Sequence, residues 1–171
     1  MLNTKTTRSS YSWKRDPLFW TYNILMCLPI IMVFFFYNYY GLNFLVYIGG
    51  IMLVLSSVLI LLAGAEFRNK GAPKGRSVVN TTVLVDTGVY AIIRHPQYLG
   101  FLLFVLGLVL MSQHWISVFS YIIGSIMFYK DVLREERMNI EKFGDDYTGY
   151  IQMVPRMNII LGLIRILQRK N

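Results

Sequence analysis

An uncharged stretch from Leu18 to Ala65 restricts the possible folds more than any other feature of the chain. It contains 48 residues, whereas one helix that crosses a bilayer needs about 20. Two such helices fit, separated by the polar turn Tyr37–Asn43. The mean hydropathy of the whole chain is +0.47, and 55% of its residues are hydrophobic. We therefore expect an integral membrane protein rather than a soluble one.

A second uncharged stretch, Tyr98–Tyr129, predicts a helical hairpin that turns at Ser112–His114. Its 32 residues are too few for two full spans, so we expect short or tilted arms, with the second helix continuing past the bilayer to about Phe143. The last apolar stretch, Ile159–Leu167, is too short to span, and its basic neighbours favour a helix in the membrane interface. The predicted fold is therefore all-α: one polytopic membrane domain, residues 1–171, with about four transmembrane helices and a C-terminal interfacial helix.

The basic residues indicate how the chain is oriented in the membrane. All 17 lysines and arginines lie in Met1–Arg15, Arg68–Arg94 and Lys130–Lys170. With four spans these segments share one face, which the positive-inside rule assigns to the cytosol. Both termini are then cytosolic, in the plasma membrane of a prokaryote or the endoplasmic reticulum of a eukaryote. Anionic lipid headgroups are the simplest partners for a net charge of +8; we expect no nucleic-acid binding, and the oligomeric state stays open.

Two titratable side chains in or between the apolar stretches are expected to have no catalytic role. Cys27, the single cysteine, lies inside the first span, where we expect a buried small hydrophobe. His114 lies at the far turn of the second hairpin, away from other ionisable groups, and we expect a solvated loop residue. No set of His, Cys, Asp or Glu residues in the sequence has the spacing of a zinc site.

The polar groups that flank the second hairpin are candidates for a site, because charge at the edge of a bilayer is costly. Pro96 can begin a helix whose free amides bind an anion, and Arg94 and His95 can bind a carboxylate or phosphate. Taken alone, they are equally typical of a positive-inside residue and a helix cap. Glu135 and Glu136 follow the last span, and by themselves they favour an ordinary helix with charge pairs at i,i+4 spacing.

The order of motifs in residues 82–155 resembles that of the integral-membrane methyltransferases, which include isoprenylcysteine carboxyl methyltransferase and the phospholipid N-methyltransferases. The resemblance implies a cytosolic pocket for S-adenosyl-L-methionine and methyl transfer to a lipidic acceptor from the bilayer. It also favours a functional role for the two glutamates. The motifs that carry it are Leu84-Val85 before Gly88-Val89-Tyr90, Arg94–Gly100, the glutamate pair, Phe143-Gly144 with Tyr147 and Tyr150, and Val154-Pro155.

The resemblance further implies roles for individual residues. Arg94, His95 and Glu136 are the expected catalytic residues. Prenylcysteine enzymes have an arginine shortly before the glutamates that is tied to the acceptor carboxylate; this chain has Asp131 there, with Arg134 nearby, and these two are the candidate acceptor-binding residues. The residues implied to contact the cofactor are Gly75, Thr82, Val83, Leu84, Val85, Tyr90, His95, Pro96, Gln97, Tyr98 and Glu135.

Several acceptors are compatible with these residues. A carboxylate acceptor needs no general base, whereas a protonated amine does, and Glu136, His95 or Asp131 are candidates. Asp131 in place of arginine favours a cationic or neutral acceptor, as in a phospholipid amine N-methyltransferase. Methylation of a thiol or phenol on a hydrophobic small molecule is a further alternative. A non-catalytic membrane protein that binds lipid or acts as a scaffold is another, although the complete set of motif residues argues against it.

Overall fold

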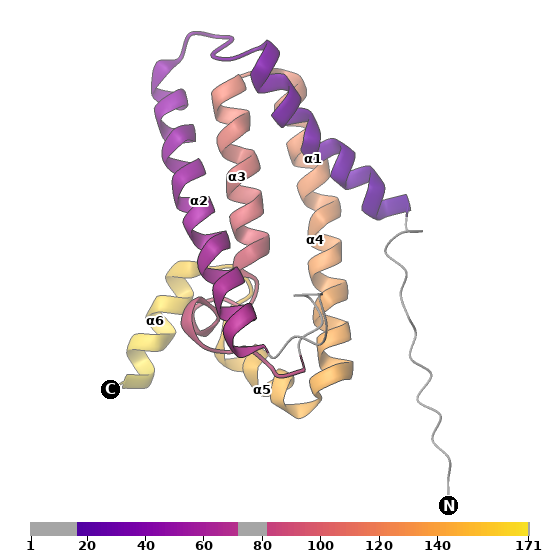
Figure 1. Ribbon diagram of the computed structural model, residues 1–171, viewed down its shortest axis with the longest axis vertical. Helices are drawn as coiled ribbons and strands as arrows, with labels where there is room; N and C mark the ends of the chain where they lie inside the picture. Colours follow the sequence, from indigo (N-terminus) through magenta and orange to yellow (C-terminus); the bar gives the residue numbers. More distant parts are fainter. Residues whose placement is uncertain (1–16, 72–81, 171) are drawn as a thin grey trace, which may run out of the picture.

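A computed structural model describes residues 17–71 and 82–170 as a bundle of helices (Figure 1). Those residues contain no strand, so the predicted all-α fold is confirmed. The elements in chain order are α1 (Pro17–Phe35), α2 (Asn43–Lys70), the 3-10 helix η2 (Gly88–Ala91), α3 (Pro96–Ser112), α4 (Trp115–Phe143), α5 (Asp145–Met153) and α6 (Ile159–Lys170).

Three helices, α1, α2 and α4, are long and apolar enough to cross a membrane. Helix α3 is apolar as well, and its 17 residues reach only the lower end of the range for a span. It lies between α2 and α4 in the bundle (Figure 1). The predicted hairpin is confirmed in its bounds, since α3 ends at Ser112 and α4 continues to Phe143. That α3 is a fourth span stays a prediction.

The turn between α3 and α4 is held by the side chain of Gln113. This residue adopts a left-handed backbone conformation with φ of 56°. Its carboxamide oxygen accepts hydrogen bonds from the backbone N–H groups of Tyr40 and Leu42, both at 3.2 Å. Its amide nitrogen donates to Asn38 Oδ1 and to the Leu42 carbonyl, both at 2.9 Å. One side chain thus joins the α1–α2 loop to the α3–α4 turn.

The expected environments of His114 and Cys27 were wrong. His114 is buried, because the segment that follows α1 covers the turn: its ring stacks on Phe36 with centroids 4.3 Å apart. Its Nδ1 accepts a hydrogen bond of 3.2 Å from the Ile116 N–H and so caps α4. Cys27 is exposed on α1. An exposed position on an apolar helix of a membrane protein faces lipid. Lipid, rather than other side chains, therefore surrounds the Cys27 thiol.

Helices α2 and α3 approach each other closely through small residues. A Cβ added at Gly49 would lie 2.6 Å from the Gly107 carbonyl oxygen, so the two backbones are nearly in contact. Ser56, a further small residue of α2, is fully buried. Gly50, the residue after Gly49, has nothing within 4 Å of an added Cβ.

This difference gives a paired test on adjacent residues of α2. We expect Gly49→Ala to destabilise the folded protein by about 1–3 kcal/mol, because the helices must separate to admit the methyl group. Gly50→Ala is the matched control and should be neutral or slightly stabilising, since alanine favours a helix and meets no atom. Denaturant unfolding in detergent micelles measures both. Equal stability of the two variants would contradict the close approach.

The C-terminal helix α6 lies at the charged end of the bundle and rests on the chain just before α3 (Figure 1). A Cβ added at Gly162 would overlap the Ile92 carbonyl group, so glycine is what permits this contact. Arg165 donates to the Gln152 carbonyl at 3.2 Å. Large apolar side chains, among them Ile160 and Leu167, are exposed on α6. This pattern is typical of an amphipathic helix, and the place of α6 in the membrane interface stays a prediction.

Candidate functional site

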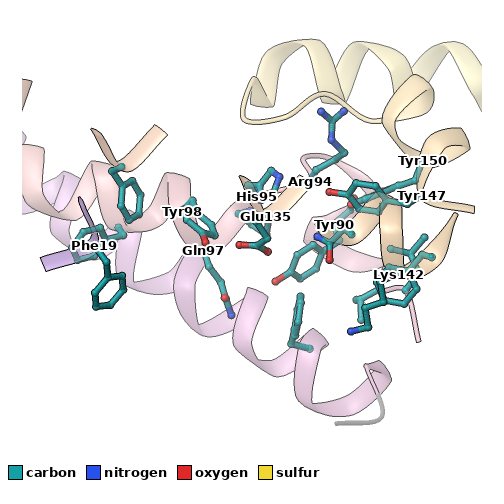
Figure 2. A pocket seen from close by; sticks show the side chains of 18 of the residues that line it. Phe19, Tyr90, Arg94, His95, Gln97, Tyr98, Glu135, Lys142, Tyr147 and Tyr150 are labelled. Carbon is teal, nitrogen blue, oxygen red and sulfur yellow. The ribbon is translucent and has the colours of Figure 1, made fainter. Parts of the chain in front are cut away.

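A cavity of about 830 Å³ lies beside the first residues of α3 and the charged second half of α4 (Figure 2). Residues from α1, α2, α3, α4, α5 and the segment before α3 line it. Its wall has two chemically different parts. The aromatic part contains Phe19 and Tyr22 of α1, Phe101 of α3 and Phe128 of α4. The polar part contains Tyr90, Glu135, Asn139 and Lys142.

One face of α4 supplies much of this wall. Glu135, Asn139 and Lys142 follow one another at i, i+4 and i+7, the spacing that places side chains on one side of a helix. Phe128 lies seven residues before Glu135 and continues the same face into the apolar part of the helix. Asn139 and Lys142 were not predicted, although helical spacing from Glu135 points to both.

Two tyrosines surround the Glu135 carboxylate. The Tyr98 hydroxyl donates a hydrogen bond to Glu135. Tyr90 is buried against Phe67, with ring centroids 5.1 Å apart, and its carbonyl accepts a 2.7 Å hydrogen bond from the Tyr150 hydroxyl. Burial, and then the charge of Glu135, raise the pKa of the Tyr90 hydroxyl above its ordinary value. Tyr90 therefore presents a neutral phenol, which can donate a hydrogen bond.

The turn that brings Tyr90 to the cavity depends on Gly88. This glycine has φ of +59°, a left-handed conformation that other residues adopt at a cost. A Cβ at this position would also overlap the Glu66 carboxylate of α2. Lys70 donates to Glu66 at 3.2 Å and to the Thr87 hydroxyl at 2.9 Å. The end of α2 is thereby fastened to the start of η2.

A buried ion cluster centred on Glu136 lies behind the cavity wall. Its Oε1 accepts hydrogen bonds from Arg94 Nη2 at 2.6 Å and Arg94 Nε at 3.1 Å, and its Oε2 accepts from Arg156 Nη2 at 2.6 Å. His95 Nε2 lies 3.2 Å from Oε1. Glu136 is only 6% exposed. The hydrogen bond from Arg156 to Glu136 raises the pKa of the Arg156 guanidinium, as an ionised partner does.

Arg94 joins this cluster to the connection between α5 and α6. Its Nη1 donates to the carbonyls of Ile151, at 3.0 Å, and Val154. Its backbone N–H donates to the Pro155 carbonyl at 3.0 Å, and the next residue donates likewise to the Arg156 carbonyl at 3.1 Å. In Figure 2 the Arg94 side chain points away from Glu135. Although Arg94 is part of the cavity lining, most of its donors are committed to other protein groups.

Most residues predicted to contact the cofactor lie together in the cavity wall. Thr82 and Val83 do not belong to that lining, and Val83 is exposed. Gly75 lies outside the described residues. Of the expected catalytic residues, His95 and Arg94 line the cavity, whereas Glu136 lies behind them. The predicted cofactor contacts found in the lining are Leu84, Val85, Tyr90, His95, Pro96, Gln97, Tyr98 and Glu135.

The two candidate acceptor-binding residues, Asp131 and Arg134, are not in the cavity lining. Asp131 is 1% exposed, and its Oδ1 lies 3.3 Å from Arg134 Nη1. Its Oδ2 is buried without a hydrogen-bond partner among the described residues.

Comparison with known protein families decides the family of the chain. The phospholipid methyltransferase family model matches residues 44–146, from the start of α2 into α5. The chain belongs to the phospholipid methyltransferase family. The matched region includes both glutamates and the Arg94–Gly100 motif, and the predicted resemblance is thereby confirmed.

Curated relatives of this phospholipid methyltransferase family member carry the name protein-S-isoprenylcysteine O-methyltransferase. That of Tribolium castaneum is 33% identical over 129 residues, which cover 72% of this chain and 45% of the relative. That of Saccharomyces cerevisiae is 41% identical over 69 residues, 40% of this chain and 29% of the relative. That of Homo sapiens is 36% identical over 77 residues, which cover 44% of this chain and 27% of the relative. The chain spans less than half the length of these relatives. No solved structure matches it significantly.

Proposed function

We propose that this protein transfers a methyl group from S-adenosylmethionine to a lipidic acceptor that enters the cavity from the bilayer. The observation that carries the proposal is the two-part cavity, in which aromatic side chains of apolar helices adjoin a polar end around Glu135. The name shared by the curated relatives supports transfer to an isoprenylcysteine. The family description supports a phospholipid acceptor as the second candidate.

The polar end of the cavity fits S-adenosylmethionine by the chemistry of its side chains. This cofactor carries an ammonium, a carboxylate, a sulfonium, a ribose diol and an adenine ring. Glu135 offers a carboxylate to a cationic group, and Lys142 offers an ammonium to an anionic one. Tyr90 and Phe67 offer aromatic surface for the base. The volume of about 830 Å³ lies within the common range of ligand cavities, roughly 300–1,000 Å³.

The aromatic end of the cavity fits the apolar part of a lipid. Phe128 packs against Tyr22 and Phe101 with ring centroids 5.4 and 5.3 Å apart, so three helices contribute to one apolar wall. Each square ångström of apolar surface removed from water contributes about 25 cal/mol. A lipid entering from the bilayer is already out of water, and the wall therefore serves mainly to orient it.

The residues of this chain assist the reaction by binding, orientation and exclusion of water. When bound, S-adenosylmethionine supplies a methyl group activated by its sulfonium. Alignment of an acceptor with that methyl contributes most of the acceleration in an in-line displacement. Glu135, held by Tyr98, favours positive charge at the polar end. Asp131 and Arg134 are proposed to bias the choice of acceptor, because they form an ion pair on α4 just before Glu135, which is in the cavity wall.

The test uses purified protein, methyl-labelled S-adenosylmethionine and nanodiscs that contain either a farnesylcysteine lipid or phosphatidylethanolamine. We expect label in one lipid fraction, and the labelled lipid identifies the acceptor class. Calorimetric titration with S-adenosylhomocysteine is the control for cofactor binding. Tight binding with no labelled lipid from these nanodiscs or from total membrane lipid would contradict the proposed transfer.

The proposed cytosolic site predicts an orientation that cysteine labelling can measure. Asp146 of α5 and Tyr40 of the α1–α2 loop are both exposed and lie at opposite ends of the bundle. In a Cys27→Ser background, we expect Tyr40→Cys to react with an impermeant thiol reagent in intact cells. Asp146→Cys should react only after the cells are opened, because the basic segments place it inside. The reverse pattern would place the cavity on the wrong side for a cytosolic cofactor.

A further inference from the structure

The hydrogen bonds around His95 determine which ring nitrogen carries a proton. Nε2 lies 3.2 Å from Glu136 Oε1. The same carboxylate accepts 2.6 Å hydrogen bonds from Arg94 and from Arg156. A carboxylate bound by two guanidinium groups is ionised and can only accept. His95 Nε2 is therefore the donor in its contact with Glu136, and the proton is on this nitrogen.

The other ring nitrogen, Nδ1, makes no hydrogen bond among the described residues, and it does not cap α3. His95 is 4% exposed and is one of the residues that line the cavity. When Nε2 carries the proton of a neutral ring, Nδ1 has a lone pair and is an acceptor. Because Nδ1 has no partner and is not among the fully buried unpaired atoms of the described residues, it keeps access to open space, and it is suited to a donor that the cavity receives.

We propose that Glu136 is a positioning residue that holds His95 as the Nε2–H tautomer, so that Nδ1 accepts a hydrogen bond from an N–H donor of the bound ligand. Glu135 is a second acceptor in the same wall. A carboxylate and a ring nitrogen together suit an ammonium or amine group. Only the identity of the ligand rests on the proposed function. The amino-acid part of the cofactor and an amine lipid both carry such a group.

Nitrogen NMR on histidine tests the tautomer directly. The chain contains two histidines, and a His114→Asn variant, which retains a helix-capping side chain, leaves His95 as the only signal. The protein is labelled with ¹⁵N-histidine and placed in phosphatidylcholine nanodiscs at about pH 8. We expect a directly bonded proton on Nε2 and none on Nδ1. A proton on Nδ1 in this sample would overturn the proposal.

Two additions then identify the donor. The first is S-adenosylhomocysteine, which carries the amino group of the cofactor. The second replaces phosphatidylcholine, which has no N–H group, by phosphatidylethanolamine, which has one. We expect one of the two additions to shift the Nδ1 resonance while Nε2 keeps its proton. The addition that causes the shift identifies the molecule that supplies the N–H donor. An Nδ1 resonance that moves with neither addition would overturn the proposal.

Two variants separate positioning from general structural effects. Glu135→Gln should leave the His95 tautomer unchanged, because Glu135 does not bond the ring. Glu136→Gln should yield a mixture of both tautomers, because a carboxamide can either donate or accept. If Glu136→Gln does not fold, the spectrum of the native glutamate still decides. Failure of S-adenosylhomocysteine to bind in calorimetry would contradict the methyltransferase proposal while leaving the tautomer measurement valid.

Discussion

Replacement of Glu136 with glutamine is expected to lower the free energy of unfolding by about 3–5 kcal/mol, because a buried cation loses its counter-ion. The main contribution comes from Arg94, which is buried with Glu136, whereas Arg156 is partly exposed and regains water. Glutamine retains the shape of the side chain, so the change isolates the charge. Equilibrium unfolding in detergent micelles, followed by helix content, measures the loss.

The matched control for this experiment is the neighbouring glutamate. Glu135→Gln should change the stability by less than about 1 kcal/mol, because this side chain lies in the cavity wall and forms no ion pair with Arg94, the buried arginine of the described residues, which is paired with Glu136 instead. A native-like stability of Glu136→Gln would show that the cluster does not hold the fold together. An equally large loss in both variants would show that the two glutamates do not differ in this respect.

Binding of the cofactor should depend on Glu135. Glu135→Gln is expected to weaken binding of S-adenosylhomocysteine by about 1–3 kcal/mol, or roughly 5- to 150-fold, because a charge-assisted hydrogen bond to the ligand is lost. Isothermal titration calorimetry in micelles measures the affinity. Glu141→Gln, on an exposed position of the same helix, is the control and should bind as tightly as the native chain. Unchanged affinity of a folded Glu135→Gln variant would exclude Glu135 from the cofactor site.

These two experiments depend on a distinction that the sequence alone does not make. Adjacent residues on a helix point about 100° apart. Glu135 therefore reaches the cavity, while Glu136 reaches the ion cluster. The sequence predicts a site near the two glutamates, but their position on the helix does not tell which of them points into the cavity. That depends on the residues that each glutamate contacts, and Arg156, a partner of Glu136, comes from a segment 20 residues further along the chain.

Other parts of the molecule were predictable to different degrees. The helix bounds followed from hydropathy and turn residues, since Pro96 begins α3 and Ser112 ends it, as expected. The aromatic wall was not predictable, because Phe19 and Tyr22 reach the cavity only through the packing of α1 on α3 and α4. His114 illustrates the same limit. Its burial depends on Phe36, which directly follows α1 and is distant in the sequence.

The hydrogen bonds from Arg94 and His95 to the carbonyls of Pro155 and Arg156 have a consequence for biosynthesis. The ribosome synthesises α1, α2, α3 and α4 before it adds that segment. At this stage Arg94 and Glu136 can pair with each other. The carbonyl groups from α5 onward, which accept hydrogen bonds from Arg94 and so fix the residues before α3, are still missing. The wall around His95 is completed only when the chain folds back after α5. Synthesis of the four helices and completion of the site are thus separate events, ordered in time by the direction of translation.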